Sequence, residues 1–153
     1  MSEPQKSSVE RDASGADGVV LSMSLGFDEL DRFCADVNFD HAADREAWNI
    51  LSRGLCEAVQ MQPTQAQKMI EQLAASTAPR SRVLAAFAVG PLAVSLPTER
   101  PEPVQELWAT LLGDESDEVS TEAARHLLTM ERDGELSHEF FRAVFARAFH
   151  ATE

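Results

Sequence analysis

A pattern of small and apolar residues recurs along this chain with a period of about 38 residues. The first set consists of Pro63, Met69, Ile70, Leu73, Ala74, Ala85, Ala86 and Val89. The second set, in the same order and with the same internal spacing, consists of Pro101, Leu107, Trp108, Leu111, Leu112, Ala123, Ala124 and Leu127. A period of roughly 20–50 residues is typical of architectures whose small units stack on their neighbours. The spacing therefore predicts units of helix, polar turn and helix that bury their apolar faces against one another.

Apolar residues within each unit follow the three-to-four-residue spacing of amphipathic helices. Alanine is abundant and β-branched runs are short, which favours helix over strand. We therefore expect an all-α domain with helices at about 27–37, 43–59, 63–74, 79–96, 104–112, 118–132 and 137–149. In the helix over 118–132, the residues expected to face inward are Val119, Ala123, Ala124, Leu127 and Leu128.

Single residues mark where several of these helices begin or end. Asp40 and Ser137 are expected to cap helix N-termini, because a short polar side chain there accepts a backbone hydrogen bond. Pro79 suits a first helical turn, where its missing N–H costs nothing. Gly134 is expected to end a helix in the left-handed conformation. Pro91 lies inside an apolar helix and is expected to kink it or end it early.

The N-terminal region differs in composition from the rest of the chain. Residues 1–18 contain Ser, Gly, Asp and Glu with almost nothing apolar, so we expect a disordered, acidic and Ser-rich tail. The apolar patch over 19–25 is expected to dock on the first helix pair. Residues 19–153 are expected to form a single domain, because a chain of this length buries one sizeable core. No leader or membrane-spanning segment is recognisable, so a cytoplasmic location is expected.

Acidic residues outnumber basic ones, with 26 Asp and Glu against 13 Lys and Arg and a formal net charge of −13. Nucleic-acid binding depends on clustered Lys and Arg, and an anionic membrane repels such a chain, so neither is an expected partner. A basic protein partner is compatible with this charge, although acidity also serves solubility. Cys34 and Cys56 lie in apolar helical patterns and are expected to be free, buried thiols.

Residues 111–127, LLGDESDEVSTEAARHL, carry the most specific pattern in the chain. They resemble the HEAT repeat, in which an apolar pair ends one helix, an Asp-containing turn follows, and the second helix opens with Val and an adjacent Arg. The matching residues are Leu111, Leu112, Asp114, Val119, Ala123 and Leu127. Ser120 stands where the family has the Arg. The preceding unit supplies that residue as Arg82, one period before Ser120, but lacks the Asp.

The resemblance implies a short right-handed α-solenoid of about three helical hairpins plus a terminal helix, in a degenerate, armadillo-type array. HEAT-like arrays mostly bind other proteins, so the resemblance also implies a binding protein. The residues themselves agree with a non-enzymatic role: the four His are scattered, and no HExxH, CxxC or glycine-rich phosphate motif occurs. No cofactor and no metal are therefore expected.

An acidic stretch over 114–122 contains no Lys or Arg. Its carboxylates favour the positive N-terminal end of the next helix, and they are also candidates for contact with a basic partner. Phe140 is a further candidate, because it neighbours Phe141 and one of two adjacent rings can lie outside the main stripe. The candidate partner-binding residues are Asp114, Glu115, Asp117, Glu118, Glu122 and Phe140.

We expect a protein–protein interaction module: an adaptor, scaffold or regulatory subunit that binds a protein partner through its helical-repeat surface. The alternative is an acidic inhibitor or immunity protein, in the manner of a nucleic-acid mimic, that caps a basic enzyme such as a nuclease toxin. This alternative needs concentrated charge, and residues 99–153 carry 13 acids against five bases. An enzyme on a helical bundle is a third class, which the missing catalytic motifs disfavour.

Overall fold

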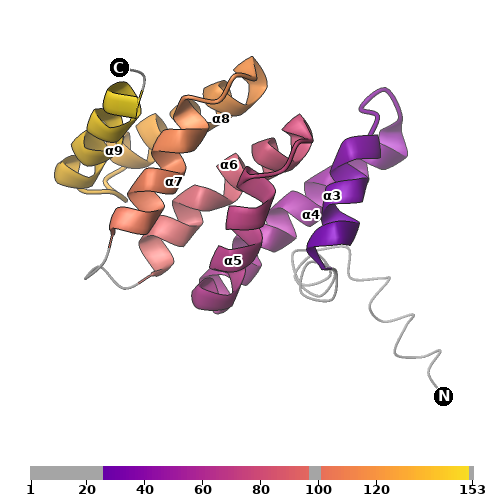
Figure 1. Ribbon diagram of the computed structural model, residues 1–153. Coiled ribbons are helices and arrows are strands. Elements are labelled where there is room, and N and C mark those ends of the chain that lie inside the picture. Colours follow the sequence, from indigo (N-terminus) through magenta and orange to yellow (C-terminus); the bar gives the residue numbers. More distant parts are fainter. Residues whose placement is uncertain (1–25, 97–100, 152–153) are drawn as a thin grey trace.

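The computed structural model describes residues 26–96 and 101–151, and within them it contains seven α-helices and no strand (Figure 1). The expected all-α class is confirmed. The helices are α3 (Phe27–Asp36), α4 (Ala42–Met61), α5 (Pro63–Ala74), α6 (Pro79–Ser95), α7 (Glu102–Leu112), α8 (Asp117–Arg132) and α9 (His138–Ala151).

Local signals in the sequence place several helix ends as expected. Pro63 and Pro79 occupy the first turns of α5 and α6. The Ser137 hydroxyl accepts a hydrogen bond from the Phe140 N–H at 3.1 Å, which caps α9. Gly134 has a φ of 79°, a left-handed conformation that lets the chain leave α8.

The expected cap of α4 is wrong by one residue. His41, not Asp40, occupies the N-cap position, and its side chain makes no capping hydrogen bond. Hydrogen bonds between side chains and backbone N–H groups stabilise the turn before α4 instead. The Asn38 side chain accepts from the Asp40 N–H at 2.9 Å, and the Asp44 carboxylate accepts from the Asn38 N–H at 2.8 Å. These side-chain bonds tie the turn to the first turn of the helix.

The helices lie in two rows (Figure 1). One row contains α4, α6 and α8, each packed on the next, and the other contains α3, α5, α7 and α9. The chain alternates between the rows, so that α5 packs against α6 and α7 against α8. The first pair differs, because α3 packs mainly on α5 and α6 and scarcely touches α4.

Helix α6 lies at the centre of the molecule and packs against α3, α4, α5, α7 and α8. A helix with neighbours on all sides must be apolar on all sides. This position explains the long apolar run in the sequence. The buried residues of α6 are Ser81, Val83, Leu84, Ala85, Ala86, Ala88, Val89, Gly90 and Leu92.

Pro91 does not end α6, which continues to Ser95. Proline has no N–H to donate to the carbonyl four residues earlier, here that of Phe87. The thiol of Cys56 on α4 donates to this carbonyl at 3.5 Å. Burial raises the pKa of Cys56 to about 11, so the thiol keeps the proton it donates. A neighbouring helix therefore satisfies the carbonyl that the proline leaves open.

One expectation about which residues of α8 face inward differs from the structure. Val119, Ala123 and Leu127 are buried and Ala124 is half-buried, but Leu128 is 51% exposed. Helix α8 is the last helix of its row, so within the described residues no further helix of that row packs beyond it. The expectation that Leu128 faces inward is therefore wrong.

Leu111 is the clearest single test of this packing, because it is buried between α7 and its neighbours at 1% exposure. We expect Leu111→Ala to lower the free energy of unfolding by about 2–5 kcal/mol, as buried leucine truncations do. Urea unfolding followed by circular dichroism measures the change. Met61→Ala, at a side chain that is 67% exposed, is the control, with an expected loss below about 1 kcal/mol. A loss at Leu111 as small as that at Met61 would contradict the hairpin packing.

Two expectations fall outside the described residues. These are the tail over 1–18 and the docking of the apolar patch over 19–25. Within the part of the chain that the structure describes, no helix combines the length and apolar character needed to cross a bilayer.

Candidate functional site

The connections after α3, α5 and α7 lie at one edge of the molecule (Figure 1). We define the loop edge as residues 37–41, 75–78 and 113–116 together with the first turns of α6 and α8. Contacts between these segments hold the edge together. The Arg80 guanidinium at the start of α6 lies 3.9 Å from the ring centroid of Phe39 and 3.3 Å from the Glu118 carboxylate.

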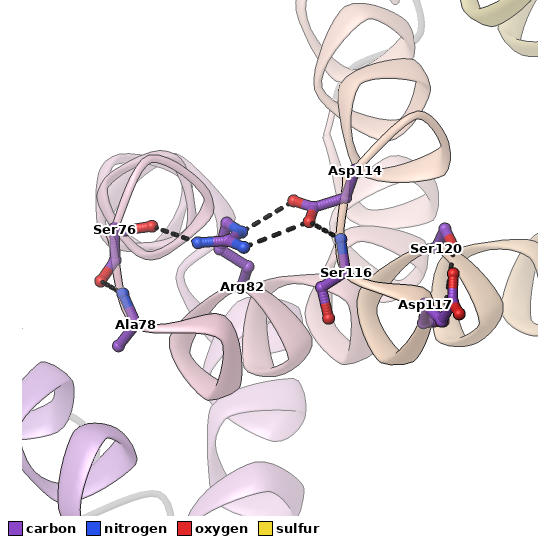
Figure 2. A network of polar contacts seen from close by, with 7 residues as sticks. All are labelled: Ser76, Ala78, Arg82, Asp114, Ser116, Asp117 and Ser120. Atoms are coloured by element: carbon purple, nitrogen blue, oxygen red, sulfur yellow. Dashed lines mark hydrogen bonds and ion pairs between the residues drawn. The ribbon is translucent and has the colours of Figure 1, made fainter.

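A nearly buried ion pair joins α6 to the connection between α7 and α8 (Figure 2). Arg82 Nε and Nη2 donate to the two carboxylate oxygens of Asp114 at 2.7 and 3.2 Å. The two side chains are only 12% and 9% exposed. Arg82 Nη1 also donates to the Ser76 carbonyl at 2.8 Å, and Asp114 accepts from the Ser116 N–H at 2.8 Å. One arginine therefore fixes two loops of the edge in place.

A second polar cluster ties α3 to the same edge. Asp31 Oδ1 accepts hydrogen bonds from the hydroxyls of Ser76 and Ser81, each at 2.5 Å. The Ser76 hydroxyl also accepts from the Ala78 N–H at 3.0 Å. Ser76 and Ser81 are buried, and these bonds satisfy their hydroxyls. The cluster thus has a structural role in positioning the end of α5 and the start of α6.

A cavity of about 450 Å³ opens on the loop edge. It lies between the end of α3, the start of α6 and the start of α8. Its lining residues are Cys34, Ala35, Val37, Ala78, Pro79, Arg80 and Glu118. Burial raises the pKa of Cys34 to about 11, despite the opposing hydrogen bond with Ser81, so the thiol is protonated at neutral pH. The cavity therefore presents apolar groups beside one ion pair and no thiolate.

Aromatic rings extend from the loop edge across the row of α4, α6 and α8. Phe39 packs edge-on against Trp48, Trp48 against Phe87, and Phe87 against His126, with centroid distances of 5.4, 6.4 and 5.0 Å. Burial lowers the pKa of His126, and the nearby Glu122 carboxylate opposes this shift. The His126 Nε2 atom lies 3.4 Å from Glu122 Oε1 without hydrogen-bond geometry. The His126 imidazole is therefore neutral near neutral pH and extends the line of aromatic rings.

The acidic stretch over 114–122 contains no Lys or Arg, but arginines from outside it pair with three of its carboxylates. Asp114 pairs with Arg82, Glu118 with Arg80, and Glu122 with Arg125. Two of these arginines come from the preceding hairpin and one from the next turn of α8.

Two acids of the stretch differ from the others. Glu115 and Asp117 are exposed, and their carboxylates take part in no ion pair within the described residues. The stretch therefore divides into three carboxylates engaged with arginines and two that face solvent.

Phe140, the remaining candidate, lies away from the loop edge. Its ring packs edge-on against Trp108 at a centroid distance of 6.1 Å, and the side chain is half-buried. Phe140 therefore contributes to the packing of α9 on α7. The structure does not bring it together with the five acidic candidates.

Sequence reasoning missed the cavity and the role of Arg80. The sequence contains one signal for the contact between Arg80 and Glu118, because these residues lie 38 residues apart, which is the period of the repeated pattern. The sequence does not predict that Cys34 and Val37 line a cavity, because they lie in the apolar stripe of the helix expected over 27–37.

The chain was compared with known proteins in three ways. It matches no protein-family model, and neither the curated proteins nor the solved structures contain a significant match. Among the described residues, no group of three or more His, Cys, Asp or Glu side chains is placed to hold a metal ion.

Proposed function

We propose that this chain is a non-enzymatic module that binds a basic segment of a protein partner at the loop edge. The observation that carries the proposal is the cavity of about 450 Å³, which has apolar lining residues and lies among acidic side chains. A cleft with apolar walls and a charged rim suits a peptide that combines apolar and charged residues. In this role the chain would act as an adaptor, scaffold or regulatory subunit that holds its partner.

Charge around the cavity favours a basic occupant. Exposed Asp36, the last residue of α3, lies between the lining residues Ala35 and Val37. Exposed Asp117 precedes the lining residue Glu118. The one cation in the lining, Arg80, is engaged by Glu118 and by the Phe39 ring. The local balance is therefore negative, in line with a net charge of −13.

We further propose that the helices form a HEAT-like, right-handed solenoid of three hairpins and a terminal helix. Three features support this reading: the two rows of helices, the alternation of the chain between them, and the contact between Arg82 and Asp114. These two residues match the Arg and Asp positions of the HEAT pattern, one in each of two successive units. In such an array the connections after alternate helices gather at one edge, where a partner reaches several units at once.

The acidic-inhibitor role is less well supported. An inhibitor that mimics nucleic acid needs closely spaced, available negative charge. Three of the five acids in the 114–122 stretch are engaged with arginines. The adaptor role needs fewer available charges, because the apolar residues of the cavity lining supply part of the contact.

Charge reversal at the loop edge tests the proposal. The double variant Asp117→Lys/Glu118→Lys, used as bait in extracts of the native host, should lose a protein that the unaltered chain retains. We expect its affinity for that protein to fall by about 10-fold or more at low salt, and the wild-type interaction to weaken as salt rises.

The matched control is Asp28→Lys/Glu102→Lys. These two exposed acids also lie in first helical turns, of α3 and α7, but at the opposite edge of the molecule. The control should retain the partner with unchanged affinity. Equal loss in both double variants, or equal retention in both, would contradict binding at the loop edge.

A further inference from the structure

A second, smaller cavity of about 170 Å³ lies beside the turn before α4. We call it the aromatic pocket and define it by its lining residues, Phe39, Arg45, Trp48 and Asn49. Phe39 belongs to the turn, and the other three belong to the first half of α4. Pockets that hold whole small molecules usually measure about 300–1,000 Å³, so the aromatic pocket suits a single side chain.

Two observations place the aromatic pocket next to the larger cavity of the loop edge. Arg80 lines the larger cavity, and its guanidinium lies 3.9 Å from the ring centroid of Phe39, which lines the aromatic pocket. Val37, another lining residue of the larger cavity, is two positions from Phe39, so their Cα atoms are at most about 7 Å apart. The two cavities are therefore neighbours across the contact between Arg80 and Phe39.

The lining of the aromatic pocket favours an apolar side chain. The rings of Phe39 and Trp48 pack edge-on with centroids 5.4 Å apart. The Arg45 guanidinium is already engaged, because its Nη1 donates to the Phe39 carbonyl at 2.6 Å. The Trp48 indole N–H is reached by solvent and donates to no group of the described residues, unlike that of Trp108. Trp48 thus offers an apolar ring to a side chain and a free donor to a carbonyl of the same occupant.

Charge around the aromatic pocket matches that around the larger cavity. Residues 36–46 contain four acids, Asp36, Asp40, Asp44 and Glu46, and one arginine, Arg45. Asp36, Asp40 and Glu46 are exposed. Both cavities therefore lie in a negative environment, and one basic segment can cover both of them.

The separation of the two cavities favours an extended segment. An extended chain advances about 3.3 Å per residue, and its alternate side chains point to the same side. Two apolar side chains at alternate positions are therefore about 7 Å apart, which is comparable with the separation of Val37 and Phe39. The residues between them point to the other side and can carry the positive charge.

We propose, in an inference that rests on the proposed function, that the loop edge binds an extended segment in which basic and apolar residues alternate. One apolar side chain occupies the larger cavity, and the apolar side chain two positions away occupies the aromatic pocket. The aromatic pocket then determines specificity, because it distinguishes basic segments that have the second apolar residue from those that lack it.

Two peptides of equal charge test this inference. Arg-Leu-Arg-Leu-Arg has two apolar side chains at the required spacing, and Arg-Leu-Arg-Ser-Arg has one. In NMR titrations of the ¹⁵N-labelled chain, the two-leucine peptide should bind about 10-fold or more tightly than the one-leucine peptide, because it buries one more leucine.

Filling the aromatic pocket should remove this difference. Asn49 is exposed, and Asn49→Phe places a ring among the lining residues, so this variant should bind both peptides equally. Gln60→Phe is the matched control, because Gln60 is also exposed on α4 but lies outside the pocket. It should keep the 10-fold difference.

The indole signals report where the second leucine binds. The chain has two tryptophans and therefore two indole N–H signals, which Trp108→Phe assigns. In the wild-type chain, the two-leucine peptide should shift the signal of Trp48 and leave that of fully buried Trp108 in place. The one-leucine peptide should shift the Trp48 signal less.

Each outcome bears on the inference. Equal affinities of the two peptides for the wild-type chain, with amide shifts at the larger cavity, would overturn the role of the aromatic pocket and leave the proposed function standing. A difference that persists in Asn49→Phe, or that disappears equally in Gln60→Phe, would also overturn it. No shift with either peptide would overturn the proposed function, and this inference with it. Circular dichroism verifies the fold of each variant, and the wild-type comparison depends on no variant.

Discussion

Trp108→Ala is expected to lower the free energy of unfolding by about 3–5 kcal/mol, which is typical of a buried tryptophan. Trp108 is fully buried, with no exposed surface. Its indole N–H donates to the Ala123 carbonyl at 3.0 Å, and its ring packs on Phe140. The side chain thus joins α7 to both α8 and α9. Its removal leaves a cavity between three helices and removes the hydrogen bond from the indole N–H.

Trp108→Phe separates the two contributions. It keeps most of the apolar packing but removes the N–H donor, so we expect a loss of about 1–2 kcal/mol. Denaturant unfolding of both variants, followed by circular dichroism, gives the comparison. If Trp108→Ala costs no more than Trp108→Phe, then α7, α8 and α9 do not pack around this ring.

Arg82→Met is expected to lower the free energy of unfolding by about 3 kcal/mol or more, because an uncompensated buried charge is strongly destabilising. The change leaves the Asp114 carboxylate with 9% exposure and no cation. It also removes the bond to the Ser76 carbonyl, which holds the connection before α6. The double variant Arg82→Met/Asp114→Leu should recover much of the loss, because it removes the isolated charge as well.

Arg80→Met is the matched control for this prediction. Its ion pair with Glu118 has side chains that are 31% and 45% exposed, and exposed pairs contribute about 1 kcal/mol or less. A double-mutant cycle at Arg82 and Asp114 measures their coupling directly. Equal losses in Arg82→Met and Arg80→Met would contradict the special role of the buried pair.

Much of the helical framework follows from local sequence signals. Pro63 and Pro79 begin helices, Gly134 ends one and Ser137 caps one, because each effect depends on the residue's own backbone or on a neighbour a few positions away. The central position of α6 can also be predicted from the sequence, because its apolar run has no polar side.

The candidate site could be predicted only in part, because it depends on residues that meet across long separations. No cation lies near Asp114 or Glu118 in the sequence. In the structure they pair with Arg82 and Arg80, which lie 32 and 38 residues earlier in the chain. The sequence pattern predicts that Leu128 faces inward together with its neighbour Leu127, but only Leu127 is buried. Whether another helix covers that side of α8 is a property of the assembled rows and not of the local pattern.

The most direct test of the central claim is a residue-level map of binding at the loop edge. We would titrate the ¹⁵N-labelled chain with a soluble peptide of alternating arginine and leucine and record amide chemical shifts. The largest changes are expected at 34–37, 78–80 and 114–118, and they should disappear in Asp117→Lys/Glu118→Lys. Changes centred on the opposite edge, at 62 and 133–137, or no changes at all, would contradict the account.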